Sequence, residues 1–215
     1  MADKRQIEVE IKDVFPTPVY FSNINRALTQ NELDFVEQLR KNCYKNEFNY
    51  TSNETEVLFY KPMNLVKEFI EVAVADYFRR IINPSKSNKI TPVITQSWLN
   101  FTKESESHHP HAHPNSLLSG VFYFNAEKEI DNISFFTNTY DRIYIESDKH
   151  NKYNATSYSF AVNTGDLLLF PSNLHHKVNT KKGKNLRVSL AFNVFFTGNI
   201  GAKSKLTHLN VDIKK

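Results

Sequence analysis

The sequence is poor in cysteine, in glycine and in long apolar runs. It has one cysteine, Cys43, and five glycines in 215 residues. A single cysteine cannot form an internal disulfide, as is usual in a reducing compartment. So little glycine excludes a collagen-like chain, and no run approaches the roughly 18 apolar residues that span a bilayer. The first ten residues lack the apolar core of a secretion signal. We therefore expect a soluble cytoplasmic protein with no membrane partner.

The composition predicts a folded chain with a substantial core. Hydrophobic residues make up 40% of the chain and aromatic residues 13%, which is enough apolar surface to offset chain entropy. We expect a single domain over residues 1–215, with a helical support at 1–90, a sheet core at 91–200 and a C-terminal tail at 201–215. The net charge of +4 is spread along the chain, so we expect no nucleic-acid partner. Closed dimers are the commonest assemblies, and a homodimer is the expected oligomer.

Two helices are predicted in the first part of the chain. A capping box that begins at Thr29 is followed by apolar residues at helical spacing, Leu33 among them, and predicts a helix over 30–43. Pro62 can open a second helix, which the turn at Pro84 ends. Their apolar stripes are interpreted as core packing.

After these helices the pattern changes to short β-rich segments. Helices first and strands later favour an α+β fold whose second half is dominated by sheet. Residues 46–56 are polar and are expected to form a loop, whereas 139–157 is too long for a hairpin turn and is either a binding loop or an extra hairpin. The predicted strands cover 92–101, 116–125, 131–137, 158–163, 166–171, 176–179 and 187–196.

Four of the eight histidines lie within the short stretch 108–113. His111 and His113 are two positions apart on an extended segment, so both can face one ion, and His108 and His109 are left as approach or surface residues. A distant histidine would complete a site in which two walls of a small barrel hold one metal. Imidazole alone does not select the ion, and an exposed polar histidine run is the alternative interpretation.

A second candidate site lies on the last predicted strand. Arg187 and Ser189 share one face, which continues through Ala191 and Asn193. A guanidinium beside a hydroxyl inside an apolar barrel needs an anionic partner, and a carboxylate is the natural one. An arginine exposed at a sheet edge, or paired with a nearby acid, is the alternative.

Four segments, taken in order, resemble the Fe(II)/2-oxoglutarate-dependent oxygenase superfamily, and within it a group that includes bacterial and phage proteins. The resemblance covers 97–193 and is specific as a multi-part pattern, although each part alone is weak. The motifs are W-x-N at 98–100, H-x-H-P and S-G-V-x-Y within 111–123, G-D-x-x-x-F-P-S-x-x-x-H-x-V at 165–178, and R-x-S-x-x-F-N at 187–193.

The resemblance implies a double-stranded β-helix, a jelly-roll or cupin-like barrel, with iron near its open end. By position in the motifs, His111 is the first Fe(II) ligand and His176 the distal one. Arg187 with Ser189 is then implied to bind the far carboxylate of 2-oxoglutarate, and Tyr123 could add its hydroxyl. His175 is expected to be near the site or on the surface, because only one of two adjacent strand residues points inward.

One position departs from the superfamily pattern. The usual second ligand is an acid in His-x-Asp/Glu, and His113 stands there instead. Imidazole in place of carboxylate raises the charge of an Fe(II) site by one and should weaken metal binding. Three interpretations stay open: a working three-histidine site of His111, His113 and His176, a carboxylate ligand from elsewhere such as Asp131 or Glu104, or metal binding without oxygenase chemistry.

The expected activity is hydroxylation of an unactivated C–H bond, with O2 and 2-oxoglutarate consumed and succinate and CO2 released. No side chain is assigned as a general base. Two alternatives are kept. One is a non-catalytic metal-binding jelly-roll module, and the other is a three-histidine dioxygenase that needs no oxo-acid, in which Arg187 would hold the substrate's own carboxylate. The substrate, a small molecule or a peptide, is not identified by the sequence.

Overall fold

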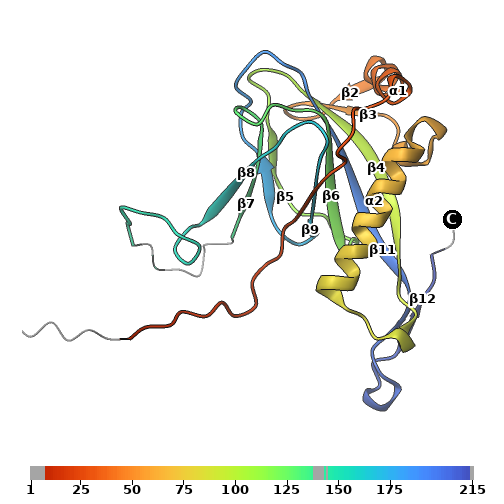
Figure 1. Ribbon diagram of the computed structural model, residues 1–215, viewed down its shortest axis with the longest axis vertical. Helices are drawn as coiled ribbons and strands as arrows, with labels where there is room; N and C mark the ends of the chain where they lie inside the picture. Colours follow the sequence, from red (N-terminus) through yellow and green to blue (C-terminus); the bar gives the residue numbers. More distant parts are fainter. Residues whose placement is uncertain (1–7, 138–142, 144, 214–215) are drawn as a thin grey trace, which may run out of the picture.

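Two antiparallel sheets hold most of the regular structure (Figure 1). The computed structural model describes residues 8–137, 143 and 145–213. The larger sheet has the order β1-β9-β6-β11-β4-β3-β2, with β12 added to β11. Its strands are β1 Tyr20–Asn23, β2 Cys43–Lys45, β3 Tyr50–Ser52, β4 Thr91–Thr102, β6 Leu118–Asn125, β9 Asp166–Pro171, β11 Arg187–Ile200 and β12 Leu209–Val211.

The smaller sheet has four strands in the order β5-β10-β7-β8. It consists of β5 His108–His111, β7 Asn132–Phe136, β8 Ser157–Ala161 and β10 His176–Val178. The two helices are α1 Gln30–Lys41 and α2 Asn64–Tyr77. A π-helical turn, Phe78–Ile82, extends α2, and single 3-10 turns occur at Val57–Phe59, Lys61–Met63, Lys86–Asn88 and Lys203–Lys205.

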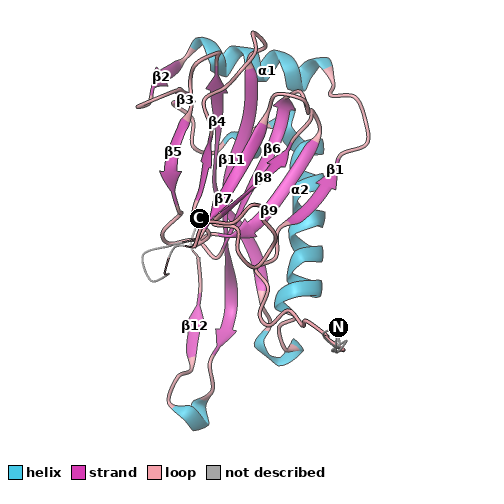
Figure 2. Cartoon of the chain, turned by 90° about the vertical axis from the view of Figure 1, so that its left-hand side faces the viewer, coloured by secondary structure: helices cyan, strands magenta, loops and turns pink. Residues whose placement is uncertain are grey.

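Alternation of side chains divides the core into two layers on either side of the larger sheet. On one side, Phe122 and Leu190 pack with helix residues such as Ile70 in the larger apolar cluster. On the other side, Tyr123 and Phe135 belong to a second cluster that joins the two sheets. Figure 1 shows α2 along one side of the larger sheet and the strands of the smaller sheet on the other, and Figure 2 shows α1 at one end of the sheets.

The sheet-rich α+β prediction is confirmed at the level of antiparallel sheets and two preceding helices. Every predicted strand after Pro84 is present, with shifts of a few residues at the ends. The capping box is also confirmed, because Thr29 accepts from the backbone of Glu32 and Glu32 accepts from the backbone of Thr29. Leu33 is wrong as a core residue, since it is 39% exposed.

The short strands outside the predicted set pair through distant partners. The loop predicted for 46–56 is wrong in part, because β3 lies within it and pairs with β4. The strands β1, β2, β5 and β12 were likewise not predicted. Each has three or four residues, too few for a periodic pattern, so long-range pairing decides their conformation.

The segment 139–157, interpreted as either a binding loop or an extra hairpin, lies in part outside the described residues. The described part ends in β8, and the turn before it is closed by a hydrogen bond from the Ala155 backbone N–H to the Asn151 carbonyl. None of the helices in the described ranges has the length and apolar character needed to cross a membrane.

Candidate metal centre

Three histidines come together at β5 and β10 of the smaller sheet, two of them on these strands and one just after β5. His111 ends β5 and lies opposite His176, the first residue of β10, and His113 follows two residues after β5. Their ligand nitrogens all lie within 4.8 Å of one another. The ring centroids of His111 and His176 are 4.3 Å apart, and both are 5.1 Å from that of His113. The structure thus brings together all three histidines that were predicted as ligands.

Backbone carbonyls orient two of the imidazoles. Nδ1 of His111 is 2.8 Å from the carbonyl oxygen of His109, and Nδ1 of His176 is 3.0 Å from that of Leu174. A carbonyl oxygen only accepts hydrogen bonds, so Nδ1 is the protonated nitrogen in both rings. Nε2 is therefore left with a free lone pair, as a metal ligand requires.

A side-chain network orients the third imidazole. Nδ1 of His113 is 2.6 Å from Oδ1 of Asn193, which also accepts from the hydroxyl of Ser119 at 3.4 Å. The Ser119 hydroxyl lies 2.8 Å from that of Ser172, which donates to Ser116 at 2.9 Å. This chain of hydroxyls holds the amide oxygen of Asn193 toward His113 and leaves Nε2 of the imidazole free.

The role of Asn193 was missed by sequence reasoning, although a signal was present. Asn193 is the last residue of the R-x-S-x-x-F-N motif and was placed on the same face as Arg187. Ser119 and Ser172 likewise belong to the S-G-V and F-P-S motifs. Motif residues that do not themselves qualify as ligands are candidates for orienting those that do.

The three histidines are held in their neutral form. Burial, together with neighbouring histidines, lowers the pKa of His176 to about 3 and that of His111 to about 4, against the backbone hydrogen bonds to Leu174 and His109, which raise the two values. Burial also lowers the pKa of His113, against the hydrogen bond to Asn193 that raises it. Neutral imidazoles close together are a donor set suited to a divalent transition metal.

Arg187 is a buried cation that faces the same cavity as the histidines. It is 3% exposed, and its Nη1 donates to the backbone carbonyl of Asn132 at 3.0 Å. Its Nε has no hydrogen-bond partner, and no acid among the described residues is within ion-pair distance. A buried guanidinium left without an anion costs several kcal/mol, on the order of 3–5 where one partner of a buried pair is missing. Arg187 is therefore neither exposed at a sheet edge nor paired with an acid among the described residues.

Tyr123 and Ser189 lie beside this guanidinium. Ser189 is directly opposite Tyr123 in the pairing of β11 with β6 and is 3% exposed. The guanidinium carbon of Arg187 is 5.5 Å from the ring centroid of Tyr123. The Tyr123 hydroxyl is buried without a partner, and burial raises its pKa to about 12, so it stays a neutral donor. Ser189 lines the cavity, whereas Tyr123 does not.

The cavity has a volume of about 1050 Å³ and lies between the two sheets. It is lined on β11 by Arg187, Ser189, Ala191 and Asn193, the face that strand alternation predicted. Trp98 is part of the wall and stacks on His113 with ring centroids 5.8 Å apart. The W-x-N motif thus supplies part of the cavity wall.

The two acids considered as replacement ligands lie elsewhere. Asp131 is buried in an ion pair with Lys181 at 3.5 Å and accepts from the side chain of Asn185. Glu104 is exposed. Neither acid joins a group of potential metal ligands in the described part of the chain. A carboxylate supplied by one of them is therefore not supported.

His108 differs from its expected position. It was expected to be an approach or surface residue, but it is half-buried, lines the cavity and has its ring centroid 4.6 Å from that of His111. His109 is on the approach, with 39% of its side chain exposed. His175 is exposed and stands apart from the trio, as expected.

Solved structures of low sequence identity share this fold. HygX from Streptomyces hygroscopicus, solved with nickel, 2-oxoglutarate and hygromycin B, is 11% identical at a TM-score of 0.56, covering 83% of this chain and 82% of that one. A prolyl hydroxylase from Trichoplax adhaerens, in complex with a hypoxia inducible factor peptide, is 12% identical at 0.56, covering 82% and 83%. The α-ketoglutarate-dependent epimerase SnoN from nogalamycin biosynthesis is 7% identical at 0.56, covering 85% and 80%.

A search of curated protein sequences found no match. A family model does match, over residues 96–193, and its description is "Putative 2OG-Fe(II) oxygenase". The matched segment contains His111, His113, His176, Arg187 and Ser189. The matched segment is thus similar in sequence to that family model, and the solved structures show that the fold is similar.

Proposed function

We propose that this chain is an Fe(II)- and 2-oxoglutarate-dependent dioxygenase of the hydroxylase type. The observation that carries the proposal is the buried, acid-free Arg187, which faces one cavity together with three neutral imidazoles. His111, His113 and His176 would hold the iron through Nε2. The bound iron, with O2 and 2-oxoglutarate, would supply the oxidising chemistry that yields succinate, CO2 and a hydroxylated substrate.

The charges of the site support a dianionic co-substrate. Fe(II) with three neutral histidines keeps both positive charges of the ion, and Arg187 adds another in the same cavity. None of the described residues that line the cavity is acidic. In a low-dielectric cavity such an excess favours an anion strongly. The two carboxylates of 2-oxoglutarate match it, one at the metal and one in the fork of Arg187.

The unpaired donors around Arg187 indicate where the far carboxylate would bind. Nε of Arg187 and the hydroxyl of Tyr123 are both buried without partners in the described part of the chain. Ser189 offers a third donor on the same strand face. A carboxylate oxygen accepts several hydrogen bonds, so it could satisfy all three groups at once. We assign Arg187 and Ser189, which line the cavity, to that end of the co-substrate; Tyr123, which does not line it, would join them only after a shift of the wall that exposes its hydroxyl.

The two sheets support a double-stranded β-helix as the frame of this enzyme. Two of the ligands come from the smaller sheet, the third from the segment that follows β5, and the carboxylate-binding residues from β11 of the larger sheet, so the proposed iron would lie between the two walls. The substrate is proposed to be a neutral or anionic small molecule or peptide. Amide and hydroxyl side chains such as Asn49, Thr51 and Asn100 line the same cavity and would bind it by hydrogen bonds.

Turnover of 2-oxoglutarate tests this proposal. Protein loaded with Fe(II) in air should form succinate from 2-oxoglutarate, slowly when no substrate is added. Arg187→Ala should weaken 2-oxoglutarate binding by about 100-fold, equal to about 2.7 kcal/mol, because a fork to a buried carboxylate is lost. Arg187→Lys should recover only part of that loss, since lysine keeps the charge but not the fork. Isothermal titration calorimetry measures the binding.

Two controls show whether the loss of 2-oxoglutarate binding is specific to Arg187. One is the metal content of each variant, and the other is the variant Arg79→Ala at an exposed residue. Arg79 is exposed on the π-helical turn that follows α2, and its variant should behave as wild type. A protein that turns over a substrate equally with and without 2-oxoglutarate would favour the oxo-acid-independent dioxygenase. Metal binding with no oxidation at all would favour the non-catalytic module.

A further inference from the structure

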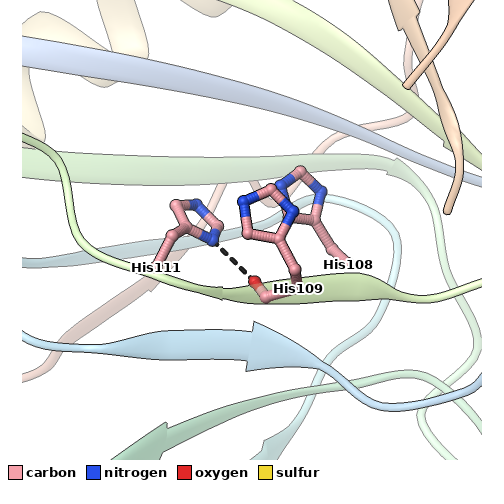
Figure 3. Close-up of side chains that lie close together, drawn as sticks. All are labelled: His108, His109 and His111. Carbon is pink, nitrogen blue, oxygen red and sulfur yellow. Dashed lines mark hydrogen bonds between the residues drawn. The ribbon is translucent and has the colours of Figure 1, made fainter. Parts of the chain in front are cut away.

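A second group of three histidines lies beside the first. His108, His109 and His111 have ligand nitrogens within 4.8 Å of one another. Their ring centroids are 4.6 Å apart for His108 and His111, 5.0 Å for His108 and His109, and 5.1 Å for His109 and His111. Figure 3 shows the three rings standing on the same side of β5. We call this group the outer trio, and His111, His113 and His176 the inner trio.

An irregularity in the pairing of β5 explains why the side chains of the adjacent residues His108 and His109 lie on the same side of the strand. In the pairing with β10, His111 is opposite His176 and His108 is opposite Val178, so three steps on β5 match two on β10. An extra residue of this kind is a bulge, which interrupts the alternation of side chains. His108 and His109 can therefore both turn toward His111, which regular strand geometry would forbid.

We propose that the outer trio is a second metal position, which takes up an ion near the surface and passes it to the inner trio through His111. Exposure falls along this route, from 39% for the His109 side chain to 5% for His176. His111 belongs to both groups and offers Nε2 alone, because its Nδ1 donates to the His109 carbonyl. One lone pair binds one ion, so the two positions are occupied in turn.

Polar neighbours contact both outer rings. Nδ1 of His108 is 3.2 Å from Nδ2 of the buried Asn49, which donates to it, the reverse of the His113–Asn193 contact. Binding of an ion by Nε2 of His108 therefore requires the Asn49 amide to present its oxygen to Nδ1 instead. Nδ1 of His109 is 3.6 Å from a carboxylate oxygen of Glu47. A carboxylate at the far nitrogen is a usual partner that orients a metal-binding imidazole. The proposal uses the inner trio as a metal site but does not depend on oxygenase chemistry.

Equilibrium titration with Co(II) tests whether the outer position exists. Wild type should bind one Co(II) per chain. The variant His113→Ala/His176→Ala, which keeps the outer trio, should still bind one Co(II), and the absorption of the bound ion should report histidine ligation. Adding His109→Ala to that variant should weaken binding by at least about 10-fold, whereas adding His208→Ala, an exposed histidine elsewhere, should change nothing.

Stopped-flow uptake of Co(II) tests the transfer and needs only single variants. His109→Ala should slow uptake by about 10-fold while the final occupancy stays at one ion. His208→Ala should take up the ion at the wild-type rate. Circular dichroism of each variant checks the fold, and the single variants decide the question if the double variant does not fold.

Three results would overturn the proposal. They are Co(II) binding to His113→Ala/His176→Ala that is no tighter than in the triple variant, two ions bound at once by wild type, and uptake by His109→Ala at the wild-type rate. All three readouts use the metal alone. A failure of 2-oxoglutarate turnover is thus distinguishable from a failure of the outer position.

Discussion

At the scale of single residues, the orientation of His113 depends on one amide. Asn193 accepts from Nδ1 of His113 and is itself held by the hydroxyl of Ser119. No other described residue is hydrogen-bonded to the His113 side chain. Without this acceptor the ring could rotate or take the other tautomer, and Nε2 would no longer be reserved for a metal.

Asn193→Ala should therefore weaken Fe(II) or Co(II) binding by about 10- to 100-fold, the usual effect of losing a partner that orients a ligand. Metal titration under anaerobic conditions measures the change. Asn173→Ala removes an exposed asparagine near the same sheet end and serves as the control, with no change expected. Equal affinity in Asn193→Ala and wild type would show that the hydrogen bond does not orient the ligand.

The site residues were predictable from sequence to the extent that strand alternation held. Arg187, Ser189 and Asn193 face the cavity because β11 alternates regularly: at both of its register shifts, the one against β4 and the one against β6, the extra residue lies on the partner strand. The position of His108 was not predictable, because the irregular pairing of β5 with β10 breaks the alternation. Such a bulge is decided by the partner strand and leaves no local signal.

At the scale of elements, β6 and β11 pack closely at one glycine. Gly120 on β6 lies opposite Phe192 on β11. A methyl group at Gly120 would collide with the ring of Phe192, which is fully buried. The side of the sheet that α2 covers thus has room for the ring only because position 120 has no side chain.

Gly120→Ala should destabilise the fold by about 1–3 kcal/mol, as overpacking in a buried core usually does. Urea unfolding measures the loss. Phe192→Leu removes the ring, so the double variant Gly120→Ala/Phe192→Leu should be less destabilised than the sum of the two single variants. Strict additivity of the two effects would rule out the contact as the cause.

The start of α1 is stabilised by a buried acid. Glu32 accepts from the backbone of Thr29 and from the guanidinium of Arg26, with 2.9 Å between Nη1 and Oε2. Burial alone would raise the pKa of Glu32, but these bonds outweigh it and hold the pKa below its ordinary value of 4.5. A lowered pKa means that ionised Glu32 adds stability above pH 4.5 and loses it as the pH falls through the folded-state value.

Glu32→Gln keeps a capping side chain but removes the charge. It should lower the free energy of unfolding at pH 7 by about 1–2 kcal/mol and make that free energy fall less steeply than in wild type as the pH drops below the ordinary pKa. Denaturant unfolding across this pH range measures both. The control is Glu37→Gln on the same helix, whose exposed pair with Arg40 should contribute little. If the free energy of unfolding of Glu32→Gln depended on pH as steeply as that of wild type, the stabilising role of ionised Glu32 would be contradicted.

Elements were predictable where their own pattern was long enough. The capping box located α1, and the twelve residues of β4 showed a clear strand pattern. By contrast β2 and β3 have three residues each, and β3 is held by its pairing with β4 and β2 by its pairing with β3. Leu33 looked apolar at helical spacing, yet the buried face of α1 turns toward Phe35, Val36 and Leu39.

At the scale of the whole molecule, the fold places a group of imidazoles and a guanidinium in one cavity. The smaller sheet and the segment that follows β5 supply the imidazoles, and β11 of the larger sheet supplies the guanidinium. Between them the cavity of about 1050 Å³ has no acidic residue among the described ones that line it. The proposed active site thus depends on the distance between the two sheets. No single sequence motif determines that distance.

Anaerobic titration of the Fe(II)-loaded protein with 2-oxoglutarate tests the central claim most directly. If His111, His113 and His176 hold the iron while Arg187 anchors the co-substrate, a visible metal-to-ligand charge-transfer band should grow to saturation with one equivalent of 2-oxoglutarate. The band should be lost in His113→Ala and retained in the exposed control His175→Ala. Bound iron that gives no such band in wild type, or an unchanged band in His113→Ala, would contradict the three-histidine centre.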